Sequence, residues 1–113
     1  MTTRALTLIY NTAKEGIVLV NIEKGIFQCN PVVRSMFGIK QETFTFESMR
    51  NQKENHKLMR LVVNATEVRK VPQEGVVTVK MPVQSQAKDV FMRIVPLKNK
   101  NEKVKLAFIF ISS

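Results

Sequence analysis

The spacing of apolar residues near the start of the chain predicts a helix. Apolar side chains recur there at intervals of three, one and three residues, and Ile17 continues the row. This is the period of one helix face, and the polar residues of the segment fall largely elsewhere. We therefore expect an N-terminal amphipathic helix over residues 3–14 that ends near Gly16. Its apolar stripe consists of Leu6, Ile9, Tyr10 and Ala13.

The next stretch predicts a strand, a tight turn, a second strand and a short helix. The run "GIVLVNI" is rich in β-branched residues, "EKG" turns the chain at Gly25, and "IFQCN" returns as a second strand. Asn30 is a favoured helix N-cap, and Pro31 suits the first helical position because its missing N–H is not needed there. Gly38 suits the position just beyond a helix. The pattern predicts a β-hairpin followed by a helix over residues 31–37.

The remaining sequence predicts one longer helix and three more strands. Residues 39–51 lack a clear period, so we expect short helical turns and loop there. A helix over residues 52–69 is indicated by the apolar stripe Leu58, Leu61, Val62, Ala65 and Val68. Pro72 and Gly75 end it. Three strands follow in "VVTVKM", "DVFMRIVPL" and "VKLAFIFI", and the last two are joined by a polar loop at residues 98–103.

These elements predict an α+β fold. A hairpin, a helical excursion and a three-stranded meander can form one five-stranded antiparallel sheet, with the helices on one face. The last strand is apolar on both faces near its end, which indicates a central strand. The chain has 113 residues and 44% hydrophobic residues, enough for one domain with a real core.

Charge and cysteine content narrow the class of protein. The formal net charge is +9, which favours an anionic partner of some kind. Cys29 is the only cysteine, so a disulfide within the chain is excluded and a reducing compartment fits best. No apolar run is long enough to span a bilayer, and the first residues do not resemble a signal peptide. We expect a cytoplasmic protein.

No catalytic or metal site is assembled in the sequence. His56 is the only histidine, no Ser lies in a Gly-flanked elbow, and the four glycines form neither a P-loop nor a dinucleotide fingerprint. A zinc site needs several Cys or His ligands, which this chain lacks. We expect a protein that is not an enzyme and holds no metal.

The order of these elements resembles the PAS domain family from about Leu6 to Ile111. Members typically show an apolar strand, a Gly turn, a strand ending in Asn, a short helix and a Gly. Here that pattern reads "GIVLVNIEKGIFQCNPVVRSMFGI". Asn30, Pro31 and Gly38 fall at the matching positions. Pro96 falls where the family often has Pro before the last hairpin loop.

The resemblance implies a sensory or protein-interaction module in signal transduction. Its host would be a histidine kinase, a cyclic-nucleotide enzyme or a transcription regulator. We expect one PAS-like domain over residues 1–113, with the N-terminal helix at 1–14 and the core at 16–111, excised from a larger protein. In this family the N-terminal helix often packs against a second copy, so the stripe of Leu6, Ile9, Tyr10 and Ala13 predicts a homodimer that acts on an output domain.

In PAS domains a ligand lies between the sheet and the helices. The residues expected to line that space are Met36, Phe37, Met59, Val62, Met92 and Phe108. We expect Met92 and Ile94 to face inward, because Phe91 and Val95 share a face with Arg93. His56 has strongly polar neighbours and is badly placed to bind haem, and Cys29 is not in the Asn-Cys-Arg helical context of flavin-binding members. A colourless protein without a cofactor is therefore predicted.

One row of basic residues leaves a second function open. Arg50, Lys53, Lys57 and Arg60 are spaced three, four and three residues apart, as on one helix face, with few acids nearby. A second basic group is Lys98, Lys100, Lys103 and Lys105 in the final hairpin. The alternative to a sensory module is thus a small basic nucleic-acid-binding domain that uses the residue 50–60 face.

Overall fold

The computed structural model describes residues 10–83 and 86–112. Residues 10–12 are helical, and the rest of the predicted N-terminal helix, with Leu6 and Ile9, lies outside the described residues. The elements that follow, in chain order, are β1 Gly16–Asn21, β2 Ile26–Cys29, α2 Pro31–Phe37, β3 Thr43–Thr45, α3 Phe46–Arg50, the 3₁₀ turn η1 Lys53–Asn55, α4 His56–Val63, the π-helical turn η2 Asn64–Val68, β4 Gln73–Val79, β5 Lys88–Lys98 and β6 Val104–Ser112.

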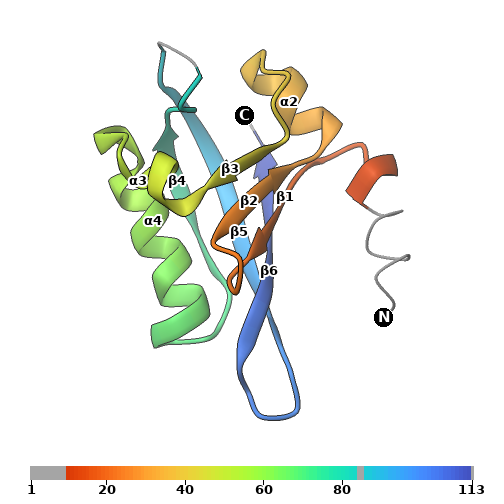
Figure 1. Cartoon of the computed structure of the whole chain (residues 1–113), viewed down its shortest axis with the longest axis vertical. Helices are drawn as coiled ribbons and strands as arrows, with labels where there is room; N and C mark the ends of the chain where they lie inside the picture. Colours follow the sequence, from red (N-terminus) through yellow and green to blue (C-terminus); the bar gives the residue numbers. More distant parts are fainter. Residues whose placement is uncertain (1–9, 84–85, 113) are drawn as a thin grey trace.

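The strands form one antiparallel sheet in the order β3-β2-β1-β6-β5-β4. The helices α3 and α4 lie on one side of it and α2 lies at one end (Figure 1). The predicted α+β architecture and the central place of β6 are confirmed. The sheet has six strands rather than five. The additional strand β3 has only three residues and pairs with β2, and such a short segment has no recognisable period.

The predicted caps of α2 are present. The side chain of Asn30 accepts a hydrogen bond from the backbone N–H of Val33, and Gly38 has a φ of 64°, in the left-handed region that favours glycine. Lys88, from β5, donates a hydrogen bond of 2.6 Å to the carbonyl of Met36 near the C-terminal end of the helix. This contact supplies a positive group where the helix carbonyls lack partners. Both ends of the short helix are therefore satisfied.

The helix predicted over residues 52–69 is divided into the three segments η1, α4 and η2. At its start, the buried amide of Asn55 donates to the carbonyls of Met49 and Lys80 and accepts from the N–H of Lys80. These contacts fix the beginning of the helix to the end of β4. At its end, the buried Thr66 hydroxyl bonds to the Val62 carbonyl in a widened turn. The spacing of apolar residues in the sequence does not predict hydrogen bonds of this kind, so the division of the helix was not expected.

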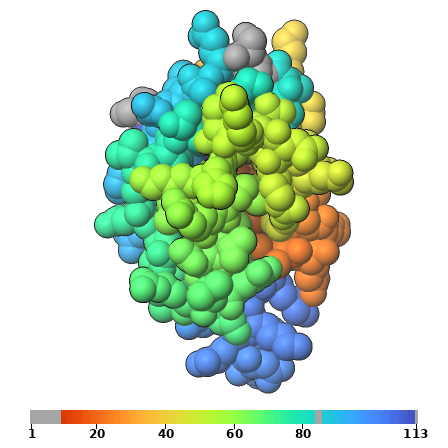
Figure 2. All heavy atoms as spheres, turned by 90° about the vertical axis from the view of Figure 1, so that its left-hand side faces the viewer, coloured from red at the N-terminus to blue at the C-terminus, as the bar shows by residue number. Residues whose placement is uncertain are grey.

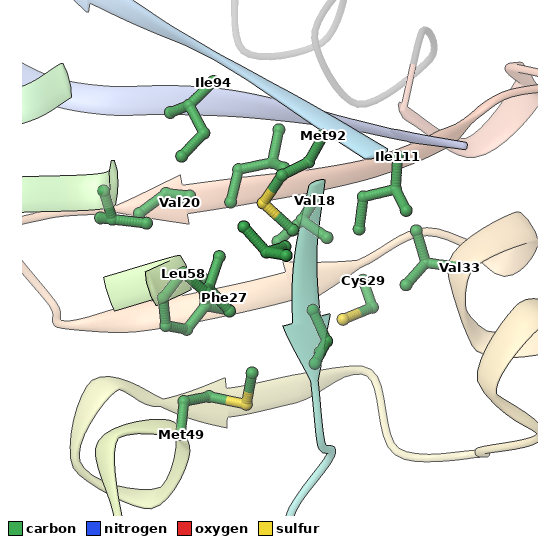
Figure 3. Packing of buried hydrophobic residues seen from close by; sticks show 14 of the residues in the cluster. Val18, Val20, Phe27, Cys29, Val33, Met49, Leu58, Met92, Ile94 and Ile111 are labelled. Carbon is green, nitrogen blue, oxygen red and sulfur yellow. The ribbon is translucent and has the colours of Figure 1, made fainter. Parts of the chain in front are cut away.

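The main core lies between the sheet and the helices. Figure 2 shows the side chains of α3, η1 and α4 covering this side of the molecule. Beneath them, inward-facing strand residues such as Val20, Phe27 and Met92 form one packed cluster with Leu58 of α4 (Figure 3). Met92 and Ile94 are 1% and 0% exposed, so the inward face was predicted correctly for β5. Burial of this apolar surface is the main contribution to the stability of the fold.

Candidate functional site

The predicted ligand space is lined by residues from α2, α4 and the inner face of the sheet. Phe37, Met59, Val62 and Met92 are all buried in the core cluster. Met36 is half-buried and packs against the same cluster. Five of the six predicted residues are therefore brought together around one interior.

Phe108 does not join the other five, and its placement in the interior was wrong. In the register between β5 and β6, Phe108 lies opposite Val95, whereas Ile94 lies opposite Ile109. Directly opposed residues of an antiparallel pair point to the same face. Phe108 therefore lies on the outer face of the sheet, where it is half-buried, and Ile109 takes the inward position at 1% exposure. The two faces of β6 are both apolar, so alternation alone did not distinguish them.

The interior is filled by side chains of the chain itself. The rings of Phe27 and Phe46 lie 4.8 Å apart between their centroids, and Phe44, Met49 and Met81 are buried in the same region. Three hollows, of about 390, 310 and 510 Å³, are lined wholly by described residues. None of these three is lined by Phe37, Met59 or Val62. The geometry favours a core that is closed by its own apolar residues.

Cys29 and His56 occupy opposite environments. Cys29 is 1% exposed on β2 and faces the core (Figure 3). Burial raises the pKa of its thiol to about 12, the nearby Arg34 lowering it in part. Because the thiolate is the reactive form, Cys29 is an inert core residue at neutral pH. His56 is exposed at the first position of α4, so its imidazole does not point into the interior.

The predicted basic row is exposed, but it is not on a single helix. Arg50 ends α3, Lys53 begins η1, and Lys57 and Arg60 lie on α4. The Lys57 amine also donates a hydrogen bond of 2.8 Å to the carbonyl of Val76 on the edge strand β4. The one ion pair formed between described residues joins Lys105 to Glu23, in the second basic group, at 3.2 Å. The positive charge of the row is thus not balanced by an acid among the described residues.

The outer face of the sheet carries apolar groups and the exposed cation Arg93. Phe91 and Phe110 of this face line the hollow of about 390 Å³ together with Glu15, Arg93, Ser112 and the edge of the inward-facing Ile111. Arg93 lies opposite Phe110 on β6 and opposite Glu74 on β4. Phe91 is 42% exposed and Val76, which is directly opposite it, is 59% exposed. Two large apolar side chains on neighbouring strands are therefore exposed side by side.

A polar cluster that the sequence did not reveal joins the N-terminal segment to the core. The Tyr10 hydroxyl donates to a carboxylate oxygen of Glu42 at 2.9 Å, and the Gln28 amide donates to the same oxygen at 3.1 Å. Tyr10 is 4% exposed, so this member of the predicted dimer stripe faces its own domain. Burial, the hydrogen bond to Glu42 and its negative charge raise the pKa of the Tyr10 hydroxyl. Only the Asn-Pro cap gave a signal for this region, since Gln28 and Glu42 belong to no motif.

Two features are absent from the described part of the chain. No helix there has the length and apolarity needed to cross a membrane. In the same part of the chain, no three His, Cys, Asp or Glu side chains gather where they could hold a metal ion.

The fold is shared with solved PAS and LOV structures. No family model matches the chain, and no curated protein matches its sequence. The LOV protein of Rhodobacter sphaeroides is similar over 99% of this chain and 68% of its own, with a TM-score of 0.76 at 12% identity. A PAS domain from Colwellia psychrerythraea is similar over 97% of this chain and 94% of its own, with a TM-score of 0.73 at 11% identity. A sensory box histidine kinase/response regulator from Burkholderia thailandensis E264 is similar over 95% and 82%, with a TM-score of 0.66 at 14% identity. These likenesses show that the chain has the PAS fold.

Proposed function

We propose that this chain is a sensory or protein-interaction module of a signalling protein and does not itself catalyse a reaction. The observation that carries the proposal is the PAS fold itself, with an apolar interior walled by α2 and α4. A histidine kinase, a cyclic-nucleotide enzyme or a transcription regulator would be a suitable host. The cytoplasm is the compartment we favour, because the single buried Cys29 needs no oxidising environment. Fusion of the chain to a constitutively active kinase core is the direct test: regulation of the kinase by the chain supports the proposal, and unchanged activity with the chain present or deleted contradicts it.

The proposal includes that the module functions without a bound flavin or haem. A flavin needs polar partners for its ring edge and a haem needs an axial ligand, whereas the core cluster consists of apolar side chains and a buried thiol. The buried polar residues Asn30, Asn55 and Thr66 already form hydrogen bonds within the chain. The freshly purified protein should show no absorbance band between about 350 and 550 nm and should remain folded without any added group. A flavin doublet, or a Soret band that disappears in His56→Ala, would contradict this part of the proposal.

We further propose that two copies associate through the N-terminal segment. Leu6 and Ile9 supply the apolar stripe, and Ala13, which is half-buried, lies at its end. Replacing both Leu6 and Ile9 with Glu should convert a dimer to a monomer in sedimentation velocity while the circular dichroism spectrum is unchanged. Loss of the folded spectrum in this variant would mean instead that the segment is part of the core.

Nucleic-acid binding is a second candidate, favoured by the exposed and unbalanced row of Arg50, Lys53, Lys57 and Arg60. Phosphate contacts release counterions, so affinity for RNA or DNA should fall steeply with salt. The double variant Lys53→Glu with Arg60→Glu should lose binding. Its matched control, Lys14→Glu with Lys40→Glu, changes the net charge equally at exposed positions elsewhere. Equal losses in both variants, or no binding at low salt, would remove this candidate.

A further inference from the structure

The side chain of Asn30 connects three separate segments of the chain. Its amide nitrogen donates to the carbonyls of Tyr10 and Glu15, at 3.2 and 2.9 Å. Its amide oxygen accepts from the N–H of Ile17 at 3.1 Å and from the N–H of Val33 at 3.0 Å. These four bonds use both donors and both acceptor positions of the amide. The residue is 0% exposed, so water cannot replace a partner that moves away.

A second contact reinforces the same arrangement near the start of α2. Tyr10 donates to Glu42, whose backbone carbonyl accepts a hydrogen bond of 2.7 Å from the N–H of Cys29, the residue before Asn30. The segment containing residues 10–15 is therefore attached at two points beside the N-terminal end of the helix. Because each attachment ends on a buried or half-buried polar group, displacing the segment leaves unsatisfied groups next to α2.

The helix α2 is in turn part of the wall of the interior. Val33 and Phe37 are 0% and 1% exposed within the core cluster. Met36 packs so closely on the start of β1 that a methyl group added at Gly16 would meet its sulfur at 3.1 Å. A change in the packing of Val33 and Phe37 would therefore shift α2. Because the N–H of Val33 donates to the side-chain oxygen of Asn30, such a shift would also displace the Asn30 amide.

We propose that Asn30 is a coupling residue that ties the position of the N-terminal segment, residues 10–15, to the packing of α2 against the core. The segment before β1 then reports the state of the interior to whatever the chain contacts there. Coupling between two parts of one molecule is reciprocal, so loosening either part loosens the other. The inference goes beyond the proposed function and does not depend on a ligand or a host.

A pair of substitutions at the two fully buried asparagines separates this coupling from general stability. Asn30→Asp keeps the oxygens that cap α2 and removes the donors to Tyr10 and Glu15. Asn55→Asp is the matched control, since Asn55 is also 0% exposed and also bonds two carbonyls, but those belong to Met49 and Lys80. Trypsin cleavage after the exposed Lys14, measured by mass spectrometry on the full chain, should rise at least tenfold in Asn30→Asp and much less in Asn55→Asp. Equal rates in the two variants would overturn the proposal.

The coupling itself is tested from the core side. Val33→Ala and Val62→Ala remove the same atoms from α2 and α4, at positions 0% and 2% exposed. At matched global stability, Val33→Ala should speed cleavage after Lys14 several-fold more than Val62→Ala, and the Asn30→Asp background should abolish that difference. Equal effects of the two cavities would contradict the proposal.

One further variant keeps the test decisive if Asn30→Asp fails to fold. Tyr10→Phe removes only the hydroxyl that binds Glu42, and it lies outside α2. Amide hydrogen exchange at Val33 should then become at least threefold faster, while exchange at Lys80, which bonds to Asn55, stays the same. Unchanged exchange at Val33 would show that the segment and α2 move independently and would overturn the proposal.

Discussion

The two faces of the sheet differ although the same strands build them. On β5, Met92 and Ile94 are 1% and 0% exposed, whereas Phe91 is 42% exposed and its neighbour Arg93 is an exposed cation. The inner face is closed by the helices, and its apolar side chains have many partners within the chain. The outer face keeps apolar and charged groups side by side with few partners among the described residues. Because side chains alternate along a strand, β5 contributes buried residues to the core on one face and exposed residues to the surface on the other.

Polar groups follow the same division. The buried polar residues Asn30, Asn55 and Thr66 all make hydrogen bonds within the chain. On the outer face, Arg93 lies between Phe110 and Glu74 across the strands and lines two hollows. A buried polar group without a hydrogen-bond partner would destabilise the fold, whereas an exposed polar group forms hydrogen bonds with water. Among the described residues, the polar groups of the inner face are therefore fixed by hydrogen bonds, whereas Arg93 on the outer face is exposed.

The largest difference in stability between the two faces should appear when an aliphatic side chain on each face is shortened to alanine. Ile94→Ala leaves a cavity at a position that is 0% exposed and should lower the free energy of unfolding by about 2–5 kcal/mol. Its control is Val95→Ala, the next residue on the same strand, which is only half-buried on the outer face and should cost less than about 1 kcal/mol. Urea unfolding followed by circular dichroism measures both. Similar losses in the two variants would show that the outer face is part of the core.

The second largest loss of stability is predicted from the close packing around Gly16, at the edge of the inner face. A methyl group at Gly16 would lie 3.1 Å from the Ile111 carbonyl oxygen and 3.1 Å from the Met36 sulfur. Gly16→Ala should therefore destabilise the protein by about 1–3 kcal/mol. Gly75→Ala is the matched control, because the nearest atom there, the Lys57 amine, is 4.0 Å away and the φ of Gly75 is not positive. Thermal unfolding should rank Gly16→Ala well below Gly75→Ala, and the reverse order would contradict the packing at α2.

Sequence reasoning reached the elements with strong local signals and missed those set by distant contacts. The cap of α2 was predicted because Asn30, Pro31 and Gly38 each have a local physical role. The break in the long helix was missed because it depends on the contact between Asn55 and Lys80, 25 residues apart. Phe108 was placed on the wrong face because β6 is apolar on both sides. The Tyr10–Glu42 contact joins residues 32 apart and had no signal at all.

The ionisation of Cys29 gives an effect on stability that appears only at high pH and reports on the inner face alone. Burial raises the pKa of the thiol from its ordinary value of 9.0 to about 12, so the native protein holds this proton more tightly than the unfolded chain. The contribution of Cys29 to stability is present below pH 9 and is lost as the pH rises toward about 12. Above pH 9, the free energy of unfolding of the native chain should fall relative to that of Cys29→Ala by about 1.4 kcal/mol per pH unit. Parallel pH profiles for the two chains would show that the thiol is not buried in solution.

The smallest effect on stability should come from a substitution on the outer face. It tests directly whether the outer face contributes to binding rather than to the fold. Phe91 is 42% exposed and lies opposite the exposed Val76, so Phe91→Lys removes few contacts within the chain. Its free energy of unfolding should change by no more than about 0.5 kcal/mol. A surface that takes part in binding should nevertheless lose that binding when a cation is introduced beside Arg93. Sedimentation velocity, which measures self-association, tests this second quantity. An unfolded Phe91→Lys variant would mean that the outer face supports the fold, while a stable variant with unchanged binding would restrict the interaction surface to the rest of the molecule.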